Sequence, residues 1–207
     1  MNNEELNAPG MADMTFTPSQ GLMPAIPNPF ENIELISYED PRIHAAPPEF
    51  NFETDASLAQ PLADMLLLKM FEWKGYGLSA NQVGLPYRVF VMGSKDTQLA
   101  LFNPTVVSVS KETSLFREGC LTFPGLYLTL KRPKECVIAY QTPNGDKVVQ
   151  QFPGMAARIA LHEYDHMQGL NFTIHASKFK VDWELKKLHK FAKKVALHNS
   201  RQNAPAA

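Results

Sequence analysis

The chain has 207 residues, and its 20 Lys and Arg nearly balance its 21 Asp and Glu, which gives a formal net charge of -1. This balance excludes a general electrostatic attraction to nucleic acids or membrane surfaces. Hydrophobic residues make up 44% of the chain, which suits one globular domain with a sizeable core. No run of about 18 or more apolar residues occurs, so a membrane-spanning helix is not expected.

Residues 1–32 are rich in Asn, Pro and Met and lack a strand or helix period, so we expect a flexible extension. Polar and acidic residues precede the apolar ones there, which is not the order of a secretory signal. The two cysteines, Cys120 and Cys136, are typical of reduced thiols, with at most one bridge between them. A cytoplasmic location is expected, and an organelle or a phage-infected cell fits the same pattern.

The first predicted elements follow this extension. A short apolar stretch at residues 33–36 is a candidate strand, and several prolines mark the loop after it. Apolar residues at helical spacing then predict a helix over residues 55–73. Pro61 fits only the first turn of such a helix, so we expect the helix to start late or to kink there.

The middle of the chain is rich in strand signals. We expect strands over residues 88–92, 99–102, 105–110, 135–141 and 147–152. The last two flank Asn144-Gly145, a dipeptide typical of tight hairpin turns. Helical patterns return at residues 155–168, where Gly169 is the expected stop, and at residues 181–198.

The sequence His-Glu-Tyr-Asp-His, from His162 to His166, lies in the second predicted helix. Residues four apart share one helix face, so both imidazoles can bind one divalent metal ion. Glu163 is a carboxylate placed to handle protons beside a metal-bound water. Because the pattern also occurs by chance in ordinary amphipathic helices, a third ligand is needed to support a metal site.

Three residues are candidates for the third ligand. His175 and Glu184 lie downstream, but their spacing matches no familiar metalloprotease pattern. Cys120 lies upstream in the sequence EGCLT, beside a glycine. A thiolate and two imidazoles would leave one coordination position open for water, as a catalytic site requires.

A third stretch, GYGLSANQ over residues 75–82, follows the first predicted helix. Its two glycines allow the backbone to approach a ligand closely. The Gln82 amide could donate a hydrogen bond to an oxyanion. Taken alone, the stretch also fits a glycine-rich helix exit with a surface glutamine.

These three stretches, in this order, resemble the signature motifs of the peptide deformylases. That family has Gly-X-Gly-Leu-Ala-Ala-X-Gln, Glu-Gly-Cys-Leu-Ser and His-Glu-X-Asp-His, and this chain has GYGLSANQ, EGCLT and HEYDH. Ser79 for Ala and Thr122 for Ser are the departures, and both are small. The resemblance spans about residues 33–175.

The resemblance implies that Cys120, His162 and His166 bind one divalent metal ion, with water as the fourth ligand. Native deformylases typically use Fe(II), and Zn or Ni can occupy the same site. The implied reaction is hydrolysis of the N-formyl group from the formyl-methionine of newly made polypeptides, which releases formate.

The remaining catalytic roles also follow from the resemblance. Glu163 would take a proton from the metal-bound water and pass it to the leaving amine. Gln82 and the backbone N–H of Leu121 would stabilise the oxyanion. Glu118 and Arg132 would form a supporting ion pair, and Asp165 would lie outside the ligand set.

By the same resemblance, the substrate would lie extended and pair with exposed backbone of the protein. That backbone would come from Tyr76, Gly77 and Gly119. The methionine pocket would be lined by Phe116, Met155, Arg158 (through its methylenes) and Ile159.

The expected fold is α+β, with mixed or antiparallel sheets around the metal-binding helix and one helix toward each terminus. We expect a catalytic domain over residues 33–180, a basic amphipathic helix over 181–199 and a frayed tail over 200–207. Some bacterial deformylases dock on the ribosome through a C-terminal helix. The lysines of this helix, which are Lys186, Lys187, Lys190, Lys193 and Lys194, could do the same or could simply be solvated.

Three rival interpretations stay open at this stage. The first is a zinc peptidase that uses the same helix, the second is a binding module that has lost catalysis, and the third is a purely structural metal. A structural site would need four protein ligands, and the sequence offers three. Neither a membrane nor sequence-specific nucleic acid is an expected partner.

Overall fold

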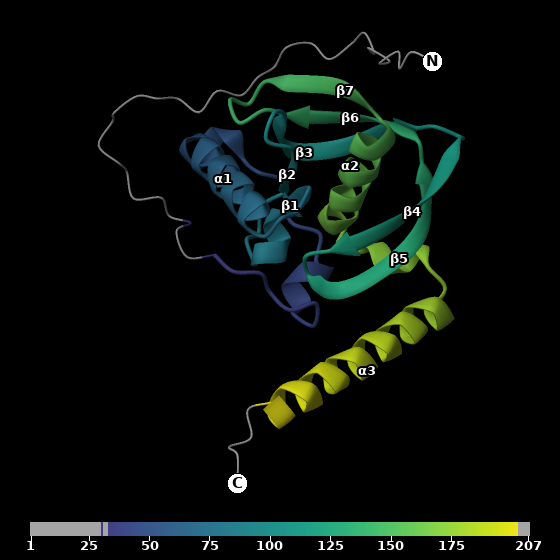
Figure 1. Cartoon of the computed structure of the whole chain (residues 1–207). Coiled ribbons are helices and arrows are strands. Elements are labelled where there is room, and N and C mark those ends of the chain that lie inside the picture. Colours follow the sequence, from purple (N-terminus) through teal and green to yellow (C-terminus); the bar gives the residue numbers. More distant parts are fainter. Residues whose placement is uncertain (1–29, 31–32, 203–207) are drawn as a thin grey trace, which may run out of the picture.

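The computed structural model describes residue 30 and residues 33–202 (Figure 1). The expectation of a flexible extension over residues 1–32 therefore lies outside the described residues, except for Phe30, which is buried and meets Tyr87 edge-on at 6.4 Å. The three α-helices are α1 (Phe52–Glu72), α2 (Gly154–Met167) and α3 (Lys178–Gln202). The strands are β1 (Gly77–Ser79), β2 (Val89–Gly93), β3 (Gln98–Val109), β4 (Thr113–Cys120), β5 (Phe123–Pro133), β6 (Glu135–Gln141) and β7 (Lys147–Pro153).

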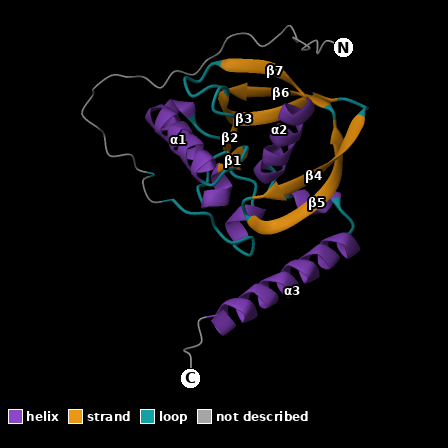
Figure 2. Ribbon diagram, in the orientation of Figure 1, coloured by secondary structure: helices purple, strands orange, loops and turns teal. Residues whose placement is uncertain are grey.

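Two antiparallel sheets flank a central helix, which confirms the expected α+β class (Figure 2). Five strands form one sheet in the order β1-β2-β3-β6-β7, and β4 and β5 form a separate hairpin. Helix α2 contacts both sheets, while α1 packs against β1 and β2 (Figure 1). The predicted hairpin at Asn144-Gly145 is confirmed, because β6 and β7 pair across it and Gly145 adopts a φ of 86°.

Several strand predictions differ from the structure. Residues 33–36 form no strand, and the Ile36 N–H bonds the Gln82 carbonyl at 2.9 Å instead of joining a ladder. The two strands predicted over 99–110 are one strand, β3, interrupted by a bulge at Asn103-Pro104. Strands β1, β4 and β5 were not predicted. β5 carries the period-2 signal, with Leu126, Leu128 and Leu130 buried, but β4 is mostly exposed and shows no clean alternation.

Helix α1 is continuous through Pro61, so the expected late start is wrong. It begins at Phe52, where the Asn51 side chain caps it by accepting from the Glu53 N–H at 2.9 Å. A proline inside a helix removes one backbone hydrogen bond. Helix α1 tolerates this loss because Leu62, Leu66 and Met70 are fully buried, and each such side chain contributes roughly 2 kcal/mol.

Helix α2 is held between the sheets and ends where the sequence predicts. Gly169, with a φ of 68°, follows the last turn, and the Leu170 N–H bonds the Asp165 carbonyl at 2.9 Å. A Cβ at Gly169 would also lie 2.6 Å from the His44 carbonyl oxygen. Both the positive φ and this close approach therefore require glycine at position 169.

Helix α3 lies along the outer side of the β4–β5 hairpin (Figure 1). Its apolar face, which includes Val181, Leu185 and Leu188, packs against Leu126, Leu128 and Leu130 of β5. The helix starts at Lys178, before the predicted residue 181, and continues to Gln202. The expected frayed tail is therefore helical at residues 200–202, and residues 203–207 lie outside the described part.

We expect Leu66→Ala to lower the free energy of unfolding by about 2–5 kcal/mol, because it opens a cavity in the core under α1. Urea denaturation followed by circular dichroism measures this change. The control is Leu68→Ala on the same helix, where the side chain is 64% exposed and the expected change is below about 0.5 kcal/mol. Equal effects of both variants would contradict this packing.

Candidate active site

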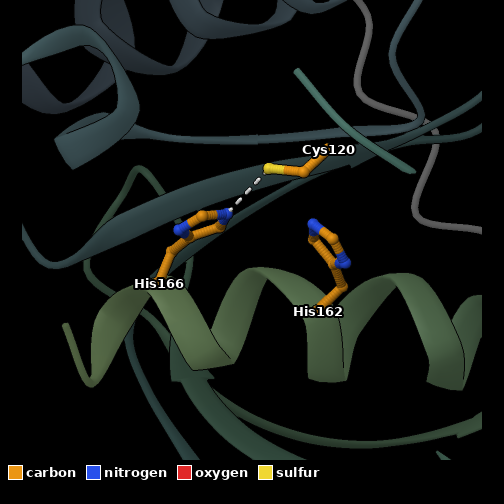
Figure 3. Close-up of side chains that lie close together, drawn as sticks. All are labelled: Cys120, His162 and His166. Carbon is orange, nitrogen blue, oxygen red and sulfur yellow. Dashed lines mark hydrogen bonds between the residues drawn. The ribbon is translucent and has the colours of Figure 1, made fainter. Parts of the chain in front are cut away.

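The side chains of Cys120, His162 and His166 meet beside α2 (Figure 3). The histidines lie one turn apart on α2, and Cys120 ends β4. One potential ligand atom from each residue lies within 4.8 Å of the others, and Cys120 Sγ is 3.3 Å from His166 Nε2. Folding thus brings Cys120 to two histidines that lie more than forty residues after it in sequence.

This donor set fits a divalent metal ion. His166 is fully buried and His162 is 8% exposed, and buried imidazoles need polar partners. Burial alone would raise the pKa of the Cys120 thiol, but the neighbouring His166 and His162 hold that pKa well below its ordinary value. The cysteine is therefore disposed to be a thiolate, which is the form that binds metal.

The downstream candidates for a third ligand lie elsewhere. His175 contacts Asp165 at 2.9 Å, and Glu184 pairs with Lys187 at 3.0 Å on α3. Within residues 33–202, the cluster of metal-type ligands consists of the cysteine and the two histidines. Three protein ligands fit a site with an open position better than a closed structural site.

A buried carboxylate, Glu118, orients His162. Its Oε2 lies 3.2 Å from His162 Nδ1, so the other ring nitrogen, Nε2, is left to face the cysteine. Glu118 also accepts from Arg132 at 2.8 Å, so the expected ion pair is present, and from Arg158. Burial opposes ionisation, but the hydrogen bonds from His162 and Arg132 outweigh it and lower the pKa of Glu118 to about 2.

Asp165 lies outside the cysteine–histidine cluster. Its Oδ2 is 2.9 Å from the Arg132 guanidinium and 2.9 Å from His175 Nε2. Burial would raise the pKa of Asp165, but the hydrogen bond from His175 and the charge of Arg132 lower it. The carboxylate thus stays charged and ties α2 to Arg132 of β5 and to the 3-10 turn at Phe172–His175.

Glu163 is buried at the floor of the pocket, with 4% exposure. Burial raises the pKa of its carboxyl group, although the nearby histidines partly oppose this. Gly77 lies directly against it, since a Cβ at Gly77 would overlap the Glu163 carboxylate. Only glycine lets β1 pass this close to the carboxylate.

The Gln82 amide has a fixed orientation. Its Oε1 accepts from the backbone N–H and the hydroxyl of Ser79, both at 2.9 Å. Its Nε2 donates to Thr122 Oγ1 at 3.1 Å and faces Cys120 Sγ at 3.5 Å. The two positions that depart from the family motifs, Ser79 and Thr122, therefore hold opposite ends of this amide, a role that sequence reasoning missed.

A pocket of about 690 Å³ opens in front of these groups. Thirteen of the sequence-predicted residues line it, which are Tyr76, Gly77, Gln82, Phe116, Glu118, Gly119, Cys120, Leu121, Met155, Arg158, Ile159, His162 and Glu163. His166, Arg132 and Asp165 lie behind this lining. The guanidinium of Arg158 pairs with Glu118 and donates to the Ser114 carbonyl. Arg158 therefore both lines the pocket and helps to neutralise the buried Glu118 carboxylate.

Sequence reasoning missed several lining residues. Lys74 precedes β1, Arg117 lies on β4, and Tyr127 lies on β5 opposite Gly119. A Cβ at Gly119 would come within 2.7 Å of the Tyr127 ring, which explains the glycine before the cysteine. None of these residues carries a motif signal. The pairing of β4 with β5 places Arg117 and Tyr127 at the pocket, and the turn between α1 and β1 places Lys74 there.

Comparisons with known proteins agree with this architecture. The family profile described as Polypeptide deformylase matches residues 33–182. A peptide deformylase of Bartonella quintana is 36% identical over 142 residues, which cover 66% of this chain and 81% of that protein. A chloroplastic peptide deformylase 1B of Oryza sativa is 33% identical over 145 residues, which cover 68% of this chain and 53% of that protein.

Solved structures show the same likeness. A peptide deformylase of Legionella pneumophila aligns with a TM-score of 0.71 and 28% identity, over 79% of this chain and 97% of that one. The enzyme of Ehrlichia chaffeensis in complex with actinonin aligns with a TM-score of 0.69 and 29% identity, over 76% of this chain and 96% of that one.

The fold and these relatives define a hydrolase with an α+β catalytic domain. The chain belongs to the peptide deformylase family. This membership argues against the zinc peptidase and against a module without catalysis.

We expect Glu118→Gln to weaken metal retention about 10- to 100-fold, because His162 loses the carboxylate that orients its ring. Metal content after timed dialysis against a chelator measures the loss. The control is Glu112→Gln, which removes the exposed ion pair between Glu112, just before β4, and Lys134, just after β5. This variant should leave metal retention unchanged. Retention in folded Glu118→Gln equal to that of the parent would refute the role.

Proposed function

We propose that this protein removes the formyl group from the N-terminal formyl-methionine of newly made polypeptides by metal-dependent hydrolysis. The products are formate and a peptide with a free methionine amino group. One observation carries the proposal: a cysteine and two histidines, a buried glutamate and an oriented glutamine amide share one pocket. The family assignment supports the same reaction.

We assign Cys120, His162 and His166 as the metal ligands. A metal bound there would polarise the formyl carbonyl and lower the pKa of water. Thiolate and imidazole donors suit Fe(II), Zn and Ni. Fe(II) is the native ion that we propose, by resemblance to the family.

Glu163 is the proposed general base and acid. Its carboxylate, which lies beside His162 in sequence and against Gly77 in space, would accept a proton from the attacking water. The same group would then protonate the leaving amine. Burial raises the pKa of this carboxyl group, which strengthens its carboxylate as a proton acceptor.

Gln82 and Leu121 are the proposed oxyanion donors. The two hydrogen bonds at Gln82 Oε1 aim its Nε2 toward Cys120, so the donor is oriented before substrate arrives. The backbone N–H of Leu121 follows the cysteine directly, and Leu121 lines the pocket. Donors held in place in this way need no rearrangement during the reaction.

The substrate backbone would enter as an added strand. β1 is the edge strand of its sheet and β4 belongs to a two-stranded sheet, so in the described residues each has one side without a strand partner. Gly77 of β1, the preceding Tyr76 and Gly119 of β4 line the pocket, where their backbone can pair with an extended peptide. The methionine side chain would contact the apolar lining formed by Phe116, Met155 and Ile159 and the methylenes of Arg158.

The chain divides into two functional parts. We propose residues 33–180 as the catalytic domain and residues 181–199 as a docking element for the ribosome. The lysines 186, 187, 190, 193 and 194 of α3 are all exposed, on faces away from the apolar contact with β5.

A cytoplasmic location suits such a role. In the described part of the chain, no helix has both the length and the apolarity that a membrane span needs.

The assay is formate release from formyl-Met-Ala-Ser by anaerobically purified protein of measured metal content. We expect Glu163→Ala to lower kcat at least about 1000-fold, because both proton transfers lose their carrier, while the metal content is unchanged. An unchanged rate in this variant would eliminate Glu163 from the mechanism. No formate from the fully metallated parent would refute the deformylase reaction itself.

Ribosome docking is tested by charge reversal on α3. We expect Lys186→Glu with Lys190→Glu to weaken ribosome cosedimentation about tenfold or more at low salt, and to spare formate release from the short peptide. The control is Lys95→Glu with Lys111→Glu, two exposed lysines away from α3. Equal cosedimentation of both double variants would remove the docking role.

A further inference from the structure

Two exposed cations line the mouth of the pocket. Lys74 lies between α1 and β1, and Arg117 lies on β4. The other Asp, Glu, Lys and Arg residues of the lining, Glu118, Arg158 and Glu163, are buried. A ligand entering this pocket therefore meets positive charge at the rim.

Neither cation is neutralised. Within the described residues, the salt bridges involve neither Lys74 nor Arg117. The nearby carboxylate of Glu72 pairs with Lys69 at 2.9 Å. The guanidinium carbon of Arg117 lies 4.5 Å from the centre of the Tyr127 ring, so this charge is held at the rim by a cation–π contact.

Each cation lies three residues before a residue of the candidate active site. Lys74 is three residues before Gly77, which touches Glu163, and Arg117 is three residues before Cys120. Three residues span at most about 10 Å. In an extended formyl-peptide, the Cα atoms of the second and third residues lie roughly 6 and 10 Å from the formyl carbon. The two rim charges are thus in reach of the side chains that follow the methionine.

We propose that Lys74 and Arg117 make this enzyme select formyl-methionyl chains with Asp or Glu at the second or third position over chains with Lys or Arg there. The inference rests on the proposed deformylase function and adds a specificity to it. The interaction energy of an exposed charge pair is modest. Each cation should therefore change the ratio of kcat/KM between an acidic and a basic substrate by roughly two- to fivefold.

The test compares amidated peptides, because a free terminal carboxylate would itself be an acidic group. Formyl-Met-Ala-Ser-amide is the neutral reference. Formyl-Met-Asp-Ser-amide and formyl-Met-Ala-Asp-amide are each compared with the matching Lys peptides. We expect higher kcat/KM for the Asp peptides, with the ratio falling toward one in about 0.5 M NaCl as the charges are screened.

The variants are Lys74→Gln, Arg117→Gln and the double charge reversal Lys74→Glu with Arg117→Glu. The Asp-to-Lys ratio is taken within each variant, so differences in total activity cancel. Each Gln variant should reduce the ratio and the double reversal should invert it. Lys131→Gln, an exposed lysine on the same hairpin outside the pocket lining, should leave it unchanged.

The outcomes separate the two proposals. Equal kcat/KM for the Asp and Lys peptides, with the neutral peptide cleaved, would overturn the specificity alone. So would an Asp preference that persists in the double reversal. No formate from any peptide would overturn the deformylase function and this inference together.

Discussion

The buried carboxylate of Glu118 is the point on which the rest of the site depends. It accepts hydrogen bonds from Arg132 of β5 and Arg158 of α2, and it faces His162 at 3.2 Å. The hairpin that carries the cysteine is thereby joined to the helix that carries the histidines. Removing one partner of such a buried ion pair costs roughly 3–5 kcal/mol, because the other charges are left unmatched.

The same network continues behind the pocket. Arg132 also contacts Asp165, and Asp165 contacts His175, so α2, β5 and the turn after α2 are linked through side-chain contacts. Such a chain of hydrogen bonds fixes side-chain rotamers as well as backbone positions. A metal site needs this rigidity because its ligands must converge to within tenths of an ångström.

In front of the network, close packing and hydrogen bonds between uncharged side chains set the geometry. Gly77 lets β1 lie against Glu163, and Gly119 leaves room for Tyr127. Ser79 and Thr122 hold the two ends of the Gln82 amide. Glu163 and Gln82, which are proposed to act on the substrate, are thus positioned by neighbours that contribute no chemistry of their own.

Features that depend on local spacing could be predicted from the amino-acid sequence alone. The two histidines face one way because the helix period brings residues 162 and 166 together, and Asn144-Gly145 specifies a turn through its own φ preferences. The three motifs in their order also identified the family. The strand predicted over residues 33–36 and the late helix start predicted at Pro61 were wrong, because long-range packing overrode local signals there.

Which residues meet across long sequence distances depends on the folded arrangement of the chain. The approach of Cys120 to the histidines, the engagement of Arg158 with Glu118, and the presence of Lys74 and Arg117 at one pocket mouth all depend on how the hairpin folds over α2. Contacts of this kind have no period in the sequence, since they are set by sheet pairing and by burial of charge, both of which exist only once the chain is folded.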